Sequence, residues 1–171
     1  MAVCGYLTDV EGNYEHFERY VGISRVLDWD TDPERKGELK LADGCEWVYG
    51  GDAVDKGAGD LRFVRQLLRL KQRYGPRVHL LIGNRDCNKL RLATELGPEA
   101  MREALHDKSF PYWLPEKDRV TPAEFLAKRE GADAEDTRAN RLKWILKDTM
   151  GADGAFERRA LELGGASDER V

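Results

Sequence analysis

Three short segments of the chain combine glycine with side chains that bind metal ions or phosphate. They read Thr8-Asp9-Val10-Glu11-Gly12-Asn13, Gly51-Asp52-Ala53-Val54-Asp55-Lys56-Gly57 and Gly83-Asn84-Arg85-Asp86. Each follows an apolar run and precedes a helical pattern, and α/β proteins place their sites at the carboxyl ends of parallel strands. We therefore expect all three segments to meet at one edge of a parallel sheet and to form a metal site.

The elements that must position these segments alternate along the first half of the chain. Apolar runs over residues 2–8, 45–50 and 78–82 predict buried strands, and residues 14–27 and 60–74 have the apolar spacing of helices. Strands separated by helices pair in parallel, because antiparallel hairpins leave no room for the helices. The first half is therefore predicted to be a parallel βαβαβ unit.

Local signals mark the ends and the inner faces of the two helices. Asn13 is the expected N-cap of the first helix, and Gly75-Pro76 is expected to end the second. Residues 28–44 are rich in charge and glycine, which predicts a solvated loop or an irregular hairpin. The residues expected to face inward are Tyr14, Phe17, Val21 and Ile23 on the first helix and Leu61, Val64, Leu67 and Leu68 on the second.

The second half of the chain has helical patterns. We expect helices over residues 98–107, 138–150 and 155–163, and Thr121-Pro122-Ala123-Glu124 is typical of a capping box with proline at the first helical position. Residues 110–115 form an aromatic linker punctuated by proline, which we expect to pack against the sheet or the helices. The sequence thus predicts a motif-bearing core over residues 1–95 and a helical segment over residues 96–171.

Together, the three motifs resemble those of the calcineurin-like metallophosphoesterases, the family of the serine/threonine protein phosphatases. The patterns D-x-[H/E]-G, G-D-x-x-D-[R/K]-G and G-N-x-[D/E] occur in this order within roughly residues 3–90. The resemblance implies the parallel βαβαβ half of a metallophosphoesterase sandwich, and hydrolysis of phosphate esters by a two-metal centre. It also implies that Asp9 and Glu11 bind the first ion, that Asp52 bridges both ions and that Asn84 binds the second.

Departures from the family pattern change the chemistry that the resemblance implies. Glu11 stands where the family usually has histidine, and a carboxylate there favours Mn²⁺ or Mg²⁺ over zinc or iron. Arg85 stands in the position of the catalytic histidine; arginine stays charged and cannot donate a proton, although it can clamp phosphate oxygens. Asp55, whose family counterpart orients that histidine, pairs with Arg85 either for catalysis or as a structural salt bridge. Lys56 replaces the family's phosphate-binding arginine.

The family also supplies metal-binding histidines from later G-H and G-H-x-H loops, which this sequence does not contain. Its histidines, His16, His79 and His106, do not follow glycine, and we interpret them as packing or surface residues. The simplest interpretation is the N-terminal half of a longer phosphoesterase, and the alternative is a natural half-domain without catalysis. We expect little or no turnover from the 171 residues alone, and either a missing C-terminal half or self-association to cover the sheet.

Composition limits the partners and the compartment. A net charge of −4, with 41% hydrophobic and 35% charged residues, describes a mildly acidic protein and argues against nonspecific nucleic-acid binding. No run approaches the roughly 18 apolar residues of a membrane span, and the start of the chain lacks a signal-peptide pattern. We therefore expect a cytoplasmic protein that is not associated with a membrane. Cys4, Cys45 and Cys87 form no C-x-x-C pair and are interpreted as reduced thiols.

Functions from different classes remain open. The first is a metal-dependent phosphoesterase acting on a phosphorylated substrate of unspecified class. The second is a catalytically inactive pseudophosphatase that binds phosphate or a phosphoprotein through Lys56, Arg85, Lys89 and Arg91, although Lys89 and Arg91 are equally consistent with a solvated helix face. A scaffold role for the helical half is a third.

Overall fold

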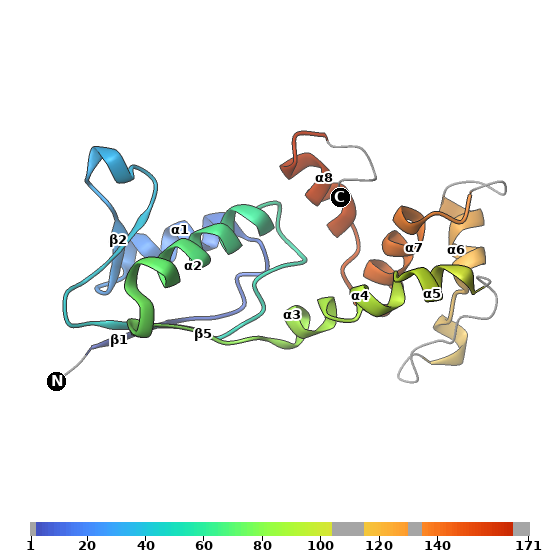
Figure 1. The fold of residues 1–171 in the computed structure, drawn as a ribbon, viewed down its shortest axis with the longest axis horizontal. Helices are drawn as coiled ribbons and strands as arrows, with labels where there is room; N and C mark the ends of the chain where they lie inside the picture. The colour runs from blue at the N-terminus through green and yellow to red at the C-terminus, as the bar shows by residue number, and fades with distance from the viewer. Residues whose placement is uncertain (1–2, 104–114, 130–134, 166–171) are drawn as a thin grey trace. The chain divides into compact units, whose positions relative to one another are not determined.

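A computed structural model describes residues 3–103, 115–129 and 135–165 of the chain and divides it into two compact units, Met1–Cys87 and Asn88–Val171. The first unit carries a parallel sheet, and the described residues of the second unit are helical (Figure 1). The division lies within helix α3 (Asn84–Lys89), closer to the N-terminus than the predicted boundary after residue 95. The three motifs therefore all belong to the first unit.

The sheet of the first unit has three parallel strands in the order β1-β4-β5: β1 (Cys4–Leu7), β4 (Glu46–Tyr49) and β5 (Val78–Leu80). Cys4 pairs with Glu46 and Trp47 pairs with Val78, which fixes the register. Parallel pairing of these three segments confirms the prediction from the alternation of strands and helices. Each strand is shorter than its apolar run.

Among the residues that the structure describes, the fully buried side chains of this sheet lie on one face. Trp47, Tyr49 and Val78 point into the core and are almost completely buried, whereas Tyr6 is 59% exposed. The prediction of buried strands was therefore wrong for the opposite face, because the side chains of a strand alternate between its two faces. Leu81 and Ile82, at the end of the third apolar run, are also exposed.

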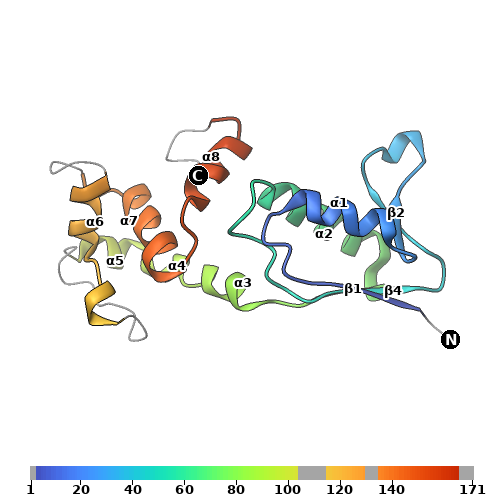
Figure 2. The ribbon, with the colours of Figure 1, turned by 180° about the vertical axis from the view of Figure 1, so that it is seen from behind.

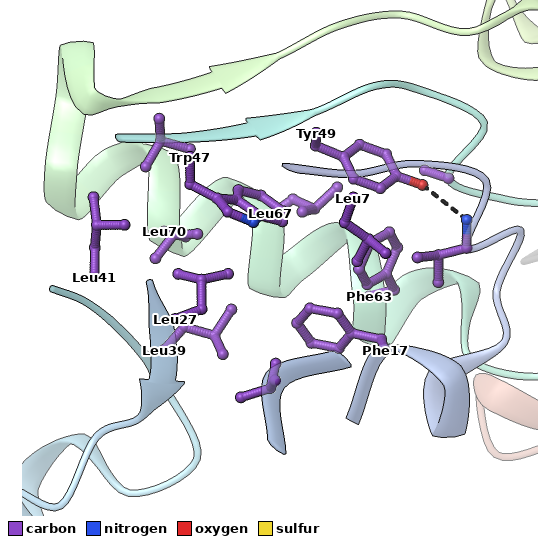
Figure 3. Close-up of a cluster of buried hydrophobic side chains, with 14 of the residues drawn as sticks. Leu7, Phe17, Leu27, Leu39, Leu41, Trp47, Tyr49, Phe63, Leu67 and Leu70 are labelled. Carbon is purple, nitrogen blue, oxygen red and sulfur yellow. Dashed lines mark hydrogen bonds between the residues drawn. The ribbon is translucent and has the colours of Figure 1, made fainter. Parts of the chain in front are cut away.

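Helices α1 (Tyr14–Ile23) and α2 (Asp60–Tyr74) cover the buried face (Figure 2). The ring of Phe63 lies between two others, with its centroid 4.9 Å from that of Phe17 and 5.2 Å from that of Tyr49, and both pairs are edge to face (Figure 3). Such pairs stabilise a core beyond the burial of their area. The predicted cap is confirmed, since the Oδ1 atom of Asn13 accepts a hydrogen bond from the N–H of His16.

Two residues predicted to face inward on these helices are exposed. Ile23 is 83% exposed because α1 ends there: Ser24 is extended, and its hydroxyl accepts hydrogen bonds from the N–H groups of Val26 and Leu27. Leu68 is 58% exposed because the buried stripe of α2 follows other positions, which are Phe63, Gln66, Leu67 and Leu70. The prediction was wrong for Ile23 and Leu68. The predicted inward residues Tyr14, Phe17, Val21 and Leu67 are buried.

The charged region between α1 and β4 forms an irregular hairpin. Strands β2 (Leu27–Trp29) and β3 (Leu39–Leu41) pair antiparallel, and a short 3₁₀ helix, η1 (Pro33–Arg35), lies between them. Leu27, Leu39 and Leu41 are buried in the same core as the sheet. The hairpin is therefore more than a solvated surface, because it packs against helices α1 and α2.

The described residues of the second unit form short helices around a separate core. They are α4 (Leu92–Glu95), α5 (Pro98–Arg102), η4 (Glu116–Asp118), α6 (Pro122–Arg129), α7 (Arg138–Trp144), the π-helical turn η5 (Ile145–Thr149) and α8 (Ala155–Glu162). Phe125, Trp144 and Phe156 are among the buried residues. The predicted capping box is present, since the Glu124 N–H donates to the Thr121 hydroxyl and the Thr121 N–H donates to the Glu124 carboxylate.

Three predictions for the second half need correction or fall outside the described residues. The helix predicted over residues 98–107 ends at Arg102, and the helix predicted over residues 138–150 changes to a π-helical turn at Ile145. The aromatic linker at residues 110–114, and His106, lie outside the described residues. No helix among the described residues has the length and apolar character needed to cross a membrane.

Candidate functional site

The three motifs lie at the carboxyl edge of the parallel sheet, one after each strand, and we call them the first loop (residues 8–13), the second loop (residues 51–57) and the third loop (residues 83–86). A backbone ladder joins the first two: the N–H groups of Asp9, Glu11 and Gly12 donate to the carbonyls of Gly51, Asp52 and Ala53 at 2.9 to 3.0 Å. The predicted meeting of the loops at one sheet edge is therefore confirmed for these segments.

Asp86 joins the second and third loops. One oxygen of its carboxylate accepts hydrogen bonds from the N–H groups of Asp52 at 2.8 Å and Gly83 at 2.9 Å, and the other accepts one from Ala53 at 2.9 Å. In return, the N–H of Arg85 donates to the Asp52 carboxylate at 2.9 Å. Hydrogen bonds to an ionised acceptor are among the strong ones in proteins, so this carboxylate fixes the relative position of the two loops.

Tyr49, at the end of β4, joins the first and second loops through its side-chain hydroxyl. Its buried hydroxyl accepts a hydrogen bond from the Val10 N–H at 3.2 Å, drawn as the dashed line in Figure 3, and it also donates one to the Asp52 carbonyl at 3.0 Å. Burial raises the pKa of this phenol, and the nearby carboxylates of Asp86, Asp9 and Asp52 raise it further, against the opposing effect of the Val10 N–H. The phenol therefore stays neutral and remains a donor.

Sequence reasoning assigned no role to Asp86 or Tyr49. Asp86 had a usable signal, because a short acidic side chain two residues after a Gly-Asn pair is typical of a turn or cap acceptor. Tyr49 had none, since its apolar run and its alternation indicate only a buried strand residue. Its polar contacts depend on where the loops return in space.

Glycine is required where the loops touch backbone to backbone. A Cβ atom added to Gly57 would lie 2.0 Å from the carbonyl carbon of Gly12, and one added to Gly51 would lie 2.4 Å from the nitrogen of Gly83. Such distances are far inside van der Waals contact. These two glycines therefore allow the second loop to pack directly on the first and third loops.

The backbone of the loops is strained at acidic residues. Among the described residues, the non-glycine residues with positive φ are Asp9 (54°), Glu11 (48°), Asp52 (57°) and Asp55 (110°). L-residues adopt this region at a cost of about 1–3 kcal/mol, and such residues cluster at functional sites. All four were singled out from the sequence as candidate site residues, so the strain supports a functional role for the loops.

Charged side chains of the three loops form a connected network. Oε1 of Glu11 lies 2.6 Å from Nε of Arg85, and Oε2 of Glu11 lies 2.9 Å from Nζ of Lys56. Arg85 also approaches Asp55, with Nη1 3.5 Å from Oδ2. The Asp55 side chain is 2% exposed and the Arg85 side chain 19%, whereas that of Lys56 is 56% exposed. The pair between Asp55 and Arg85, inferred from the sequence, is therefore present.

The residues predicted to bind metal are brought to one edge but are differently engaged. Asp9 and Asn84 are exposed, and neither side chain has a hydrogen bond or ion pair within the part of the chain that the structure describes. Asp52 has one oxygen engaged by the Arg85 N–H, and both oxygens of Glu11 face cations. Over the described ranges, no group of three or more His, Cys, Asp or Glu side chains is arranged to hold a metal ion.

The oxygens that remain available fit a hard cation rather than a soft one. Carboxylate and amide oxygens suit Mg²⁺ and Mn²⁺, and Asp9, Asp52 and Asn84 supply that donor set. Glu11 does not fit as a ligand while Arg85 and Lys56 hold it. The loops contain no imidazole: His16 is exposed on α1, and Nε2 of His79 lies 2.9 Å from the Glu46 carboxylate on the sheet.

No protein-family model matches this chain, and no curated protein matches it either.

Proposed function

We propose that the chain is a metal-dependent phosphoesterase, the N-terminal βαβαβ half of a calcineurin-like sandwich, acting on a phosphorylated substrate. One observation carries the proposal: three loops at the carboxyl edge of a parallel sheet are held together by backbone hydrogen bonds and the Asp86 carboxylate. This arrangement brings the carboxylates of Asp9 and Asp52 and the amide of Asn84 to the same edge as the cations Lys56 and Arg85. Oxygen ligands beside fixed cations are what a metal-bound phosphoryl group requires.

Each loop residue has a distinct part in this proposal. Asp9, Asp52 and Asn84 would hold a divalent cation, with Mn²⁺ or Mg²⁺ favoured by the oxygen donors. A bound cation polarises a phosphoryl oxygen and lowers the pKa of bound water. Arg85 would bind phosphoryl oxygens through its planar guanidinium. The buried carboxylate of Asp55, 3.5 Å from Nη1 of Arg85, orients this guanidinium. Lys56, which is largely exposed, adds a positive charge at the rim.

The same residues limit the chemistry. Arg85 cannot protonate a leaving group, and loss of a general acid costs about 10²- to 10⁴-fold in rate. Esters whose leaving group needs no proton are affected least. We therefore expect at most slow turnover, with activated aryl phosphates as the best substrates.

The engagement of Glu11 favours a second candidate, a pseudophosphatase that binds phosphate or a phosphoprotein without turnover. Both oxygens of Glu11 are neutralised by Arg85 and Lys56, so the first metal position that the resemblance implies has lost a ligand in this arrangement. An anion can still displace Glu11 from these cations. Binding without hydrolysis is the expected behaviour of that candidate.

Calorimetry with Mn²⁺ tests the metal site. We compare the wild-type chain with Asp52→Asn and, as a matched control, Asp43→Asn, because Asp43 is exposed and has no hydrogen bond or ion pair among the described residues. We expect Asp52→Asn to weaken Mn²⁺ binding at least tenfold and Asp43→Asn to leave it unchanged. Equal affinity in all three proteins would show that the ion binds elsewhere and would refute the proposal.

Hydrolysis of 4-nitrophenyl phosphate with Mn²⁺ separates the two candidates. Turnover that depends on Mn²⁺ and disappears in Asp52→Asn supports the phosphoesterase. Binding of phenylphosphonate, which resembles a phosphate monoester but is not hydrolysed, together with no turnover of the aryl phosphate supports the binding module. Absence of both binding and turnover contradicts both candidates.

A further inference from the structure

The Glu11 carboxylate lies against two cations that come from different loops. Its Oε1 atom is 2.6 Å from Nε of Arg85, and its Oε2 atom is 2.9 Å from Nζ of Lys56. The side chains of Glu11 and Arg85 are both mostly buried, at 20% and 19% exposed. A carboxylate and a phosphoryl group offer the same kind of oxygen pair to a guanidinium and an ammonium. Glu11 therefore occupies a place that also suits a phosphoryl group.

The two cations keep their places when the Glu11 side chain turns away. The carbonyl of Glu11 accepts hydrogen bonds from the N–H groups of Lys56 at 2.9 Å and Gly57 at 2.6 Å, which fixes the second loop on the first. On the third loop, the N–H of Arg85 donates to the Asp52 carboxylate at 2.9 Å. None of these contacts uses the Glu11 side chain. Its rotation toward solvent therefore leaves Lys56 and Arg85 on either side of the same position.

The charges that meet at this position cancel one another. Arg85 and Lys56 supply two positive charges, and Glu11 and Asp55 supply two negative ones. Asp55 cannot turn away, because its side chain is 2% exposed and lies 3.5 Å from Nη1 of Arg85. An anion that replaces Glu11 restores the cancellation with one negative charge and exceeds it with two. Partly buried charges are screened less than exposed ones, so the second charge is unfavourable here.

We propose that this position selects phosphodiesters over phosphomonoesters, and that the Glu11 carboxylate makes the selection as an internal competitor for Arg85 and Lys56. The inference rests on the proposed function and names the substrate class of that site. A diester carries one negative charge, like the carboxylate that it displaces, whereas a monoester carries about 1.5 to 2 at neutral pH. The displaced carboxylate stays tethered nearby and repels the second charge.

Calorimetry on the metal-free chain compares two anions that differ by one methyl group. Phenyl phosphate is a monoester with two charges at about pH 8, because its second pKa lies near 6, and methyl phenyl phosphate is the diester with one charge. We expect the diester to bind at least about fivefold more tightly. A repulsive charge pair at roughly 4 Å changes affinity by about this factor even at the dielectric constant of water, and by more in a partly buried site.

The variant Glu11→Gln removes the charge of the competitor and keeps its shape. We expect it to bind the diester about five- to tenfold more tightly and the monoester by a larger factor, so that the preference narrows at least about twofold. Glu15→Gln is the matched control, because Glu15 is exposed and has no hydrogen bond or ion pair among the described residues. This control makes the same change in net charge and should alter neither affinity by more than about twofold.

A second change tests whether the anion contacts the cations. In the Glu11→Gln background, Lys56→Met removes an ammonium that no longer faces a carboxylate at position 11, so its effect reports contact with the anion. We expect the diester to bind at least about fivefold less tightly than in Glu11→Gln alone. Lys56 suits this test because its side chain is 56% exposed. Circular dichroism checks that each variant is folded; should Glu11→Gln be unfolded, the comparison of the two anions on the wild-type chain still decides.

The outcomes separate this inference from the proposed function. Equal or tighter binding of the monoester by the wild-type chain refutes the selection, as does binding that neither Glu11→Gln nor Lys56→Met changes. If only Glu11→Gln binds the anions, Glu11 excludes both ester classes and the selection is refuted as well. Anion binding that requires Mn²⁺ refutes the inference and leaves the proposed function standing. If no protein binds either anion, with or without Mn²⁺, both fail.

Discussion

The Tyr49 hydroxyl offers the sharpest test of how the loops are held. Tyr49→Phe removes one oxygen and leaves the ring in the core. The Val10 N–H loses its partner, because Val10 is 1% exposed and water cannot replace the hydroxyl. The Asp52 carbonyl loses one donor but keeps another, the Glu11 N–H at 3.0 Å.

These contacts set the expected magnitude. A buried N–H left without a partner costs about 1–3 kcal/mol, and a lost hydrogen bond to a group that keeps another partner costs about 0.5–1.5 kcal/mol. We therefore expect Tyr49→Phe to lower the free energy of unfolding of the first unit by about 2–4 kcal/mol. Fast amide exchange at Val10 should accompany the loss.

Urea denaturation followed by tryptophan fluorescence measures this effect, because Trp47 stacks near Tyr49 with ring centroids 6.1 Å apart. Tyr14→Phe is the matched control: the Tyr14 hydroxyl is buried and has no hydrogen-bond partner among the described residues, so its removal should cost nothing or stabilise the fold. If Tyr49→Phe is no more destabilising than Tyr14→Phe, the hydroxyl does not hold the loops and our reasoning is wrong.

Three further predictions concern the same unit. Because the pKa of Tyr49 is raised in the folded state, the unfolded state loses the phenolic proton first as pH increases, and the free energy of unfolding should fall above about pH 10. This fall should be steeper in the wild-type chain than in Tyr49→Phe, by up to about 1.4 kcal/mol per pH unit. Urea titrations at several pH values measure the difference. Asp86→Asn replaces one acceptor oxygen by an amide that faces an N–H group, so urea denaturation should show a loss of about 2–4 kcal/mol, and a loss below about 0.5 kcal/mol would contradict the bridging role. Finally, the exposed sheet face should drive self-association that Leu81→Ser weakens, as light scattering over a concentration series measures, and a monomer at every concentration would contradict this.

Much of the first unit could be predicted from the sequence because its signals are local. Alternating apolar runs and helical spacings predicted three parallel strands, and the Asn13 cap is a short-range contact that the structure contains. In the second unit, the Thr121–Glu124 capping box is another such contact. The errors occurred where local patterns are ambiguous. Ile23 continues the apolar spacing of α1, but the hydroxyl of Ser24 ends the helix by bonding to the following N–H groups.

The site was predictable as a set of residues, and its internal contacts were not. The order of the motifs placed Asp9, Asp52 and Asn84 at one sheet edge, because parallel strands present their carboxyl ends together. Which cation would face Glu11 depends on side chains 45 and 74 residues further along the chain, at positions 56 and 85. No local pattern encodes that choice.

The sequence by itself determined the residue types, the alternation of strands and helices, and therefore the common edge at which the three loops meet. Only the tertiary structure decided that Asp86 and Tyr49 join these loops, that acidic residues there take positive φ, and that Glu11 pairs with Arg85 and Lys56. The physical reason is range. Periodicity and capping act within a few residues, whereas a buried hydroxyl or carboxylate finds its partners only after separate strands have brought distant loops within hydrogen-bond distance.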